Sequence, residues 1–344
     1  MSAPLSGSTS LEPASPELDL LQLITSFWTT HAIGAVVTNG IADAVTDSPQ
    51  PVAAIAASCG MEPAAVLRLL RALCTRGIFT AHTADSFSHS ALSRLLRSDN
   101  PRSLAGAVRM YTRELYIGWG RFADGVREGR TSWEIAFGQP LFDHLEQHPE
   151  ALARFQQGMT SLAGAVYRDD LIAAAFDWSS LRRVIDLGGG QGNFLDAVLT
   201  AAPHLEGVLC DRPEVIARAQ ARPHPPGFAA MEGDLFEGVP AGFDALILKR
   251  VIHDWNDEES VTILRHCARR MQPDGRVLII EFVLGEPGPG SSFGWWNDLN
   301  MQAITGGRER TRGEFSQLAD GAGLSLRAVH PTPTPLAIVE LGRS

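Results

Sequence analysis

The sequence has a single lysine, Lys249, among its 29 basic residues, and its 39 acidic residues give a formal net charge of -10. A protein that binds nucleic acid needs a concentrated basic face, so this balance disfavours a nucleic-acid partner. Cysteine is also scarce. Cys59, Cys74, Cys210 and Cys267 lie far apart and form no CxxC pair. We therefore expect reduced, packed cysteines and no metal site.

Long apolar runs and targeting signals are also lacking. No uninterrupted apolar stretch reaches the roughly 18 residues of a membrane span, and residues 1–19 lack the basic start and apolar run of a secretory signal. We therefore expect a cytoplasmic protein without a membrane partner. With 44% hydrophobic and 20% charged residues, the 344-residue chain is typical of a globular protein of about two domains.

The first third of the chain predicts a helical domain. Residues 1–14 are rich in Ser, Pro and Gly, and we expect them to form a disordered tail. Residues 18–45 are apolar on too many sides for a lone surface helix, which favours burial against another chain. Two helices around a turn near Gly60, followed by a strand-like segment, complete a winged-helix-like domain over residues 15–110.

A winged helix raises the alternative of a DNA-binding regulator. Arg68, Arg71 and Arg76 lie on or just after the second helix, which is the recognition helix in such proteins. Residues 1–110, however, hold seven arginines against eight acidic residues, a net charge of -1. This charge is poor for attracting a polyanion, so a dimerisation or substrate-lid role is favoured over DNA binding.

The rest of the chain, residues 111–344, predicts an α/β domain that begins with a helical, aromatic-rich segment over residues 111–178. After it, helices alternate with short apolar runs, which are RRVIDL, GVLC, FDALILK, RVLIIEF, LSLRAVH and PLAIVELG. The alternation predicts a Rossmann-like, mostly parallel sheet with helices on both faces. The Pro-rich turn between the last two runs predicts a terminal hairpin with an antiparallel strand.

A glycine-rich turn follows the first of these strands and opens a helix. In VIDLGGGQG, which runs from Val184 to Gly192, the spacing is GxGxG instead of the GxGxxG of dinucleotide folds, and no GKS or GKT follows. This favours a nucleotide-like ligand without a pyrophosphate, held against bare backbone, with Asp186, Gly188 and Gly190 contributing to its site. A plain strand-to-helix turn is the alternative.

Acidic residues follow the next two strands. Asp211 ends the second strand about 20 positions past the turn, where a carboxylate can accept both hydroxyls of a ribose. Asp234 and Leu235 lie in the loop after the third strand. Each acid alone is more typical of a solvated loop, but acids after successive strands favour a ligand site, because open α/β sheets bind ligands at the carboxyl ends of their strands.

These features resemble a family, the plant caffeate-type and bacterial small-molecule O-methyltransferases that use S-adenosylmethionine. The resemblance covers most of the chain and is most specific in DLGGGQGNFL, GDLFEGVPAGFDALILKRVIHDWNDEES and NDLNMQAITGGRERTRGEFSQLADGAGL. It implies a homodimer formed through the N-terminal domain, S-adenosylhomocysteine as a product, and no metal. The cofactor-binding residues that it implies are Gly188, Gly190, Asp211, Asp234, Leu235 and Lys249.

The catalytic centre is expected at His253, just after the strand that ends near Lys249. Glu281 closes the apolar strand VLIIEF, where a charge is costly unless it is paired, and Glu309 lies in GGRERT. The resemblance implies that both carboxylates flank a catalytic histidine. The alternatives are a surface histidine beside a helix, an ordinary charge at a strand end, and a glutamate that favours a helix N-terminus.

These residues predict a base-assisted displacement. A histidine with a reference pKa of about 6.5 can accept the proton of a phenol as the oxygen attacks, and a carboxylate on one imidazole nitrogen fixes the tautomer. We assign this orienting role chiefly to Glu309, with Glu281 assisting. Capping boxes at Asn256 with Glu259 and at Thr311 with Glu314 are expected to anchor the two loops.

The acceptor implied by the resemblance is a small aromatic molecule, phenolic, polyketide-like or phenazine-like. Methionines at family positions clasp its ring, and thioether contacts with rings are favourable, although isolated methionines are more often core residues. The expected substrate-binding residues are Phe155, Met159, Trp255, Trp296, Asp298 and Met301. Methylation of nitrogen, and hydroxylation or decarboxylation by a non-methylating relative, are the alternative reactions. His253 with both glutamates disfavours the second of these.

Overall fold

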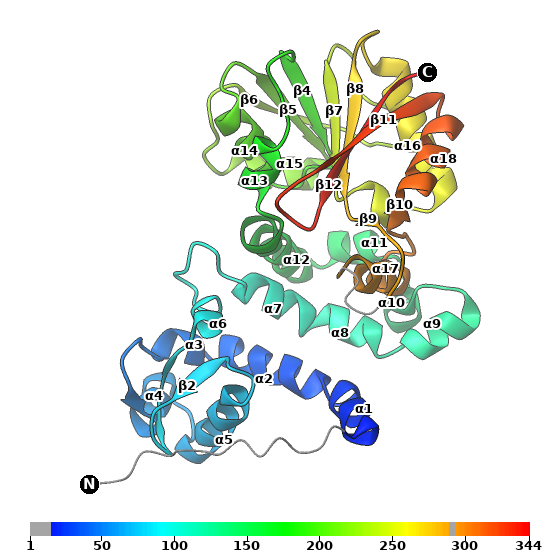
Figure 1. The fold of residues 1–344 in the computed structure, drawn as a ribbon. Coiled ribbons are helices and arrows are strands. Elements are labelled where there is room, and N and C mark those ends of the chain that lie inside the picture. Colours follow the sequence, from blue (N-terminus) through cyan, green and yellow to red (C-terminus); the bar gives the residue numbers. More distant parts are fainter. Residues whose placement is uncertain (1–14, 289–292) are drawn as a thin grey trace. The chain divides into compact units, whose positions relative to one another are not determined.

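The computed structural model describes residues 15–288 and 293–344, so the tail expected at residues 1–14 lies outside the described residues. The chain forms two compact units, Met1–Arg113 and Glu114–Ser344, which are shown in Figure 1. Each unit has its own buried apolar core.

The first unit is a helical domain with a small sheet. Its strands pair in the order β1-β3-β2, and both pairings are antiparallel. Its helices are α1 (Pro16–Ile24), α2 (Phe27–Thr38), α3 (Ile41–Ala44), α4 (Val52–Cys59), α5 (Pro63–Cys74), α6 (Ala91–Arg94) and α7 (Ala105–Tyr111), and its strands are β1 (Gln50–Pro51), β2 (Phe79–Ala81) and β3 (Ser86–His89). The two helices and the strand-like segment expected after residue 50 are therefore present, and α4 ends at a left-handed Gly60.

An exposed apolar surface covers α1 and the start of α2. It consists of Leu20, Leu21, Leu23, Ile24, Phe27 and Trp28. The combined segment Pro16–Thr38 is long and apolar enough to cross a membrane, and the bent pair α4 and α5 passes the same test only if it is taken as one span, with a bend of 114°. The sequence expectation counted only uninterrupted apolar runs and therefore missed this segment. Length and composition alone do not distinguish a membrane span from an apolar helix that is buried against another chain.

The second unit contains helices around a seven-stranded sheet. Its helices are α8 (Glu114–Trp119), α9 (Phe122–Glu128), α10 (Ser132–Phe137), α11 (Leu141–Gln147), α12 (Pro149–Leu162), α13 (Asp169–Ala174), α14 (Asn193–Ala201), α15 (Pro213–Gln220), α16 (Asp257–Arg270), α17 (Phe293–Ile304) and α18 (Arg312–Gly321), with a π-helical turn (Ala163–Tyr167) and a 3-10 turn (Ile252–Asp254). Its strands are β4 (Arg183–Leu187), β5 (Glu206–Asp211), β6 (Phe228–Glu232), β7 (Ala245–Lys249), β8 (Arg276–Glu281), β9 (Val283–Leu284), β10 (Arg310–Thr311), β11 (Leu324–Pro331) and β12 (Ala337–Arg343).

The large sheet has the strand order β11-β12-β8-β7-β4-β5-β6. Strands β4 to β8 pair in parallel with one another, whereas β12 pairs antiparallel with both β8 and β11. The mostly parallel sheet and the terminal hairpin expected from the sequence are both confirmed. Because the chain order reverses between β4 and β7, the carboxyl ends of these strands form the edge where such folds bind ligands.

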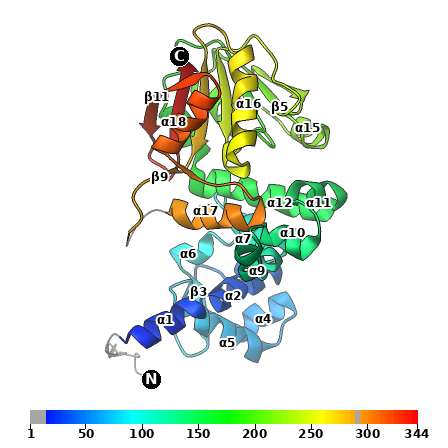
Figure 2. The ribbon, with the colours of Figure 1, turned by 90° about the vertical axis from the view of Figure 1, so that its right-hand side faces the viewer.

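Both faces of the sheet are covered, because its central strands carry apolar side chains on both faces, with Asp186, Lys249 and Glu281 at or near their carboxyl ends. In β7, Ala245 and Ile247 face the core that α13, α14 and α15 complete, while Leu246 and Leu248 face the core completed by α16 and α18. This is the period-two alternation of strand side chains. Figure 2 looks onto α16 and α18 on their side of the sheet.

The helix α17 is held to the helices that precede the sheet. It packs against α8 and α10. The indole nitrogen of Trp119 donates to the Asn300 side-chain oxygen at 2.9 Å, and the Ser132 hydroxyl donates to the carbonyl of Ala303, also at 2.9 Å. These contacts fix α17, which carries three of the expected site residues.

Candidate active site

His253 lies directly beyond the carboxyl end of a central strand. β7 ends at Lys249, and Arg250 turns the chain with a positive φ of 56° into the 3-10 turn that contains His253. The neighbouring strand β8 ends at Glu281. The imidazole is buried, with 5% of its side chain exposed, so the alternative of a surface histidine beside a helix does not hold.

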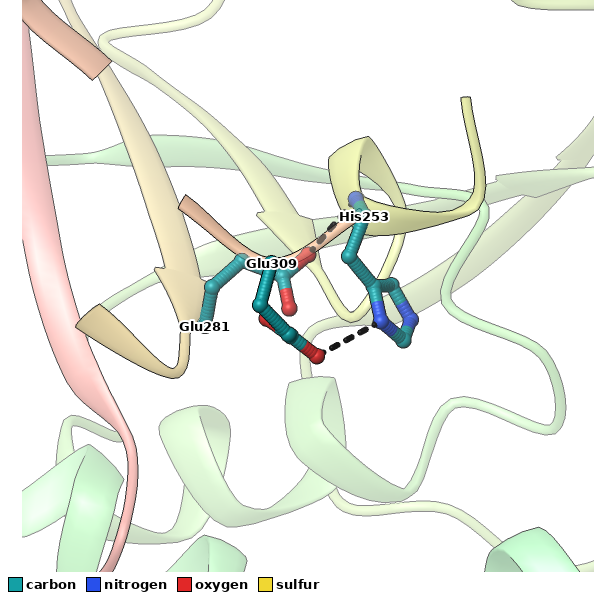
Figure 3. A group of neighbouring side chains, drawn as sticks. All are labelled: His253, Glu281 and Glu309. Atoms are coloured by element: carbon teal, nitrogen blue, oxygen red, sulfur yellow. Dashed lines mark hydrogen bonds and ion pairs between the residues drawn. The ribbon is translucent and has the colours of Figure 1, made fainter. Parts of the chain in front are cut away.

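Glu309 reaches this point from a segment more than fifty residues further along the chain. β9 pairs in parallel with β10, with Val283 opposite Arg310, and this short ladder places the residue before β10 next to the end of β8. Figure 3 shows the result: Oε1 of Glu309 lies 3.0 Å from Nδ1 of His253. If Nδ1 carries the proton and donates it to this carboxylate, Nε2 keeps the lone pair and is the basic nitrogen.

Glu281 contacts the backbone of the histidine turn instead of the imidazole. Its Oε1 accepts the backbone N–H groups of Val251 at 3.0 Å and of His253 at 3.4 Å, and the second contact is drawn in Figure 3. The side chain is fully buried. Glu281 therefore contacts the turn, while Glu309 contacts the ring. From the sequence, Glu281 is expected to assist Glu309 in orienting the imidazole, whereas the structure places its carboxylate on the backbone.

Two further side chains complete the cluster, and sequence reasoning missed both. Nη1 of Arg250 donates to Oε2 of Glu281 at 3.0 Å and to Oε1 of Glu309 at 2.7 Å. Nδ2 of Asn297, from α17, donates to the same Oε1 of Glu309 at 2.6 Å. Oε1 of Glu309 thus receives two fixed donors, and a third when Nδ1 of His253 carries its proton, which keeps the carboxylate ionised and in place.

The turn that carries His253 is also clamped by the segment before α18. The buried guanidinium of Arg310 donates to the carbonyl oxygens of Ile252 at 3.0 Å and Trp255 at 2.9 Å, and it pairs with Asp257 at 2.8 Å. Both expected capping boxes form, at Asn256 with Glu259 and at Thr311 with Glu314. Arg310 follows Glu309 directly in GGRERT, and this position was the only indication in the sequence that it lies near the catalytic turn.

The charges of the cluster shift its proton affinities. Burial lowers the pKa of His253 and the Arg250 charge lowers it further, but the carboxylates of Glu281, Asp254 and Glu309 outweigh both, so the pKa is raised above its ordinary value. Burial raises the pKa of Glu281. It opposes ionisation of Glu309 as well, yet contacts with Arg250 and His253 lower the pKa of Glu309 to about 2.

One atom from each of His253, Glu281 and Glu309 lies within 4.8 Å of the others, a spacing that can hold a metal ion. The Arg250 guanidinium, however, already contacts both carboxylates at 3.0 and 2.7 Å. A fixed cation therefore occupies the electrostatic position that a metal ion would take, and we assign no metal here.

The glycine-rich turn and Asp211 form a second group of expected site residues. Gly188 and Gly190 have positive φ values of 69° and 60°, a backbone conformation that residues with a Cβ rarely adopt. One carboxylate oxygen of Asp211 accepts the backbone N–H of Gly190 and the other accepts that of Arg212, both at 2.8 Å. Each oxygen retains a lone pair for a further donor, such as a hydroxyl.

Asp186 has an unusual environment below this turn. It is fully buried, and neither carboxylate oxygen has a hydrogen-bond partner among residues 15–288 and 293–344. Burial raises its pKa to about 7. An unpartnered carboxyl group near the carboxyl end of a central strand fits a cationic ligand, because a positive charge would stabilise its ionised form. Nearby, Nζ of Lys249 pairs with Asp169 at 3.0 Å, which leaves Asp186 without this lysine as a direct partner.

The loop after β6 contributes the last two residues expected at the cofactor. Leu235 packs against the core below Val251 and lies close to Gly188, since a Cβ built on this glycine would be 3.6 Å from the leucine side chain. The Asp234 side chain is exposed and accepts the backbone N–H of Phe236 at 2.8 Å. Leu235 is thus brought to the glycine-rich turn, and Asp234 forms a loop contact.

The residues expected at the acceptor are more dispersed. Met301 is buried on α17, one helical turn from Asn297 and therefore on the same face, whereas the neighbouring Trp296 faces away and is 68% exposed. Asp298 accepts the backbone N–H of Glu309 at 2.9 Å, so it supports the catalytic loop. Phe155 and Met159 are half-buried on α12. The half-buried Trp255 lies edge-to-face with Phe236 at 4.7 Å.

Comparison with known protein families identifies the chain. An O-methyltransferase domain matches residues 119–325, and an O-methyltransferase dimerisation domain matches residues 21–99. The chain therefore belongs to the O-methyltransferase family. The resemblance stated from the sequence and the expected fold class are both confirmed, and the protein is an O-methyltransferase.

Relatives and solved structures match along almost the whole chain. A phenazine O-methyltransferase of Lysobacter antibioticus is 37% identical over 325 residues, covering 93% of this chain and 94% of the relative. A mitomycin biosynthesis 6-O-methyltransferase of Streptomyces lavendulae is 32% identical and covers 96% of both. The structure of an O-methyltransferase from neocarzinostatin biosynthesis, in complex with S-adenosylmethionine and 2-hydroxy-5-methyl naphthoic acid, superposes with a TM-score of 0.77 at 30% identity, covering 94% of this chain and 98% of its own.

Gly307 generates the first prediction, because it packs directly on the histidine turn. A Cβ on this glycine would overlap the carbonyl oxygen of His253 and the backbone of Asp254, neither of which can move alone. We expect Gly307→Ala to displace the turn from Glu309 and to lower kcat by at least about tenfold while the affinity for the cofactor persists. Gly313→Ala is the matched control, because its Cβ would have 3.9 Å of space. Equal activity of the two variants would show that the turn tolerates displacement.

The raised pKa of His253 generates the second prediction. A base whose pKa lies above its ordinary value of 6.5 remains protonated to higher pH, so the rate should rise with pH through a midpoint above 6.5. The measurement is the pH profile of kcat/KM, which reports groups of the free enzyme. An acid limb with its midpoint well below 6.5 would contradict the assigned charge balance.

Proposed function

We propose that this enzyme transfers the methyl group of S-adenosylmethionine to a hydroxyl group of a small aromatic metabolite, phenolic, polyketide-like or phenazine-like. The observation that carries the proposal is the buried contact between His253 and Glu309, which orients a basic nitrogen. Membership of the O-methyltransferase family, the aromatic acceptors in the names of relatives, and a neighbouring structure with S-adenosylmethionine and a naphthoic acid support it.

The cofactor would supply a methyl group on a positively charged sulfur, and this sulfur is a good leaving group because it departs as a neutral thioether. The residues that would hold it are the turn at Gly188 and Gly190, Asp211 for the ribose hydroxyls, and Leu235 beside the turn. The unpartnered carboxylate of Asp186 fits the positive charge of the ligand. Lys249 and Asp234, expected from the resemblance, remain predictions at this site.

His253 acts as the general base in this proposal. A phenol has a pKa near 10 and is protonated at neutral pH, so a base that takes its proton during attack raises the nucleophilicity of the oxygen. Nε2 of His253 takes the proton, and the Glu309 carboxylate at 3.0 Å from Nδ1 stabilises the resulting imidazolium. Met159, Met301, Phe155 and Trp255 are proposed to hold the aromatic ring.

The alternative reactions are less well supported. Methylation of an amine needs no general base during attack, because the amine nitrogen has a free lone pair and loses its proton afterwards. The buried pair of His253 and Glu309 therefore suits a hydroxyl acceptor better. The same pair disfavours hydroxylation or decarboxylation. A DNA-binding role for the first unit is disfavoured by its net charge of -1 over residues 1–110 and by its match to a dimerisation domain.

The exposed apolar surface of α1 and α2 supports a homodimer. Monomeric proteins rarely expose a contiguous apolar surface of this kind, and the matched dimerisation domain includes most of it. A second copy of the chain accounts for the apolar segment Pro16–Thr38 without a membrane. A cytoplasmic location stays an expectation from the sequence.

The function is tested with isotopically labelled cofactor and a panel of hydroxylated aromatic compounds, locating the label by mass spectrometry. We expect transfer to oxygen, and a loss of at least about 100-fold in kcat for His253→Ala with unchanged cofactor affinity. Asp211→Ala should instead weaken cofactor binding in calorimetry. His266→Ala, which removes a histidine on α16 outside the His253 cluster, is the control and should keep the parent kcat. Label on nitrogen alone, or full turnover by His253→Ala, would refute the proposal.

The homodimer is tested by light scattering coupled to gel filtration. The double variant Leu23→Glu with Phe27→Glu places two charges on the exposed surface of α1 and α2, where burial against a partner would be costly. We expect it to halve the measured mass, whereas Leu92→Glu, at an exposed position on α6, should leave the mass unchanged. A monomeric parent chain, or a double variant that stays dimeric, would contradict this assignment.

A further inference from the structure

Arg250 lies inside the catalytic cluster, but the reaction as proposed gives it no part. Its side chain is 5% exposed, and its Nη1 bridges the fully buried carboxylates of Glu281 and Glu309. The rings of Tyr167 and Phe282 lie against the guanidinium, with centroids 5.4 and 5.0 Å from its central carbon. An arginine does not lose its proton in a protein, so this positive charge is permanent.

The backbone at Arg250 indicates that its inward position is maintained by its contacts. With a φ of 56° it is one of two non-glycine residues with a positive φ in the described part of the chain. A residue with a Cβ adopts this conformation at a steric cost, and glycine would form the same turn without it. The two ion pairs and the aromatic contacts offset this cost.

The charges around the imidazole explain why a permanent cation matters. The groups that face or adjoin His253 are Glu281 from β8, Glu309 from the segment before β10, and Arg250 and Asp254 from its own turn, with Asp254 at 3.7 Å from Nε2. Asn297 from α17 is the neutral donor. With Arg250 present, the two fully buried carboxylates and one cation leave a single net negative charge, and Asp254 adds a second at the rim of the cluster. The imidazolium neutralises one of these charges when it forms.

Without Arg250, the same space would hold two buried carboxylates and no fixed cation. Like charges in one buried site raise the affinity for a proton, and the imidazole is already in contact with Glu309. The proton would be taken up in advance, and a histidine that is protonated before the acceptor arrives cannot act as a base.

We propose that Arg250 is a positioning residue that keeps Glu281 and Glu309 ionised together and thereby leaves His253 free to accept the proton of the acceptor. The catalytic role of His253 within this proposal rests on the proposed function. The charge relationship between Arg250 and His253 does not, and it can be measured without any turnover.

The experiment compares Arg250→Met, which keeps a long side chain without the charge, with Arg250→Lys, which keeps a charge. Both place a Cβ in the same backbone conformation, so the steric cost is matched. The pKa of His253 is measured by NMR on protein labelled with nitrogen-15 in its histidines, using His253→Gln to assign the signal. We expect Arg250→Met to raise this pKa by about one unit or more, and Arg250→Lys to leave it near that of the parent chain.

The pH profile of kcat/KM gives the second readout. For Arg250→Met we expect a loss of about tenfold on the acid side that recovers as the pH rises, with cofactor affinity retained. A purely structural role would lower kcat/KM by the same factor at every pH. An unshifted His253 pKa in Arg250→Met, or a pH-independent loss shared equally by Arg250→Lys, would overturn the proposal.

A charge-balanced variant covers the case in which Arg250→Met does not fold. Arg250→Met combined with Glu281→Gln removes one positive and one negative charge, so the His253 pKa should return to within about half a unit of the parent value. A shift of a full unit in Arg250→Lys would then count against the proposal. If the parent enzyme methylates no acceptor, the proposed function fails, whereas the NMR comparison still decides the role of Arg250.

Discussion

The hydrogen bond between Glu309 and His253 depends on bringing together two segments 56 residues apart in the chain. Neither segment can hold its charged side chain in the interior alone, because an isolated buried carboxylate or imidazolium is too costly. The short parallel ladder of β9 and β10, the guanidinium of Arg310 on the histidine turn, and Gly307 against its backbone all serve to maintain this contact. The loops at the carboxyl ends of the strands therefore hold His253 buried and paired with Glu309.

The two groups of site residues use opposite electrostatic arrangements. Around His253, the carboxylates of Glu281 and Glu309 both contact the guanidinium of Arg250, which suits a base that must change its charge during the reaction. At the glycine-rich turn, Asp186 is buried with no hydrogen-bond partner in the described part of the chain, and Asp211 has lone pairs left for further donors. The first arrangement has its counter-charge within the chain, whereas the second suits a ligand that supplies the missing positive charge and hydroxyl groups.

The fold was largely predictable from the sequence, because its strands are short apolar runs between helices and because the glycine-rich turn is a local feature. The contact of His253 with Glu309 was predictable only through resemblance, since nothing local links two segments so far apart. Arg250 and Asn297 were missed: an arginine after a lysine is typical of a surface loop, and its burial follows from the tertiary pairing with Glu281 and Glu309. The Lys249 pairing with Asp169 and the outward position of Trp296 likewise depend on packing, which periodicity does not report.

The central claim is that Nδ1 of His253 is held by Glu309 while Nε2 faces the hydroxyl group that is methylated. A crystal structure of the enzyme with S-adenosylhomocysteine and an accepted aromatic substrate tests it most directly. We predict that Nε2 lies about 2.6 to 3.2 Å from the substrate oxygen, while the contact of Nδ1 with Glu309 is unchanged. A substrate oxygen that is bound elsewhere, with Nε2 beyond the reach of one bridging water, would contradict the account.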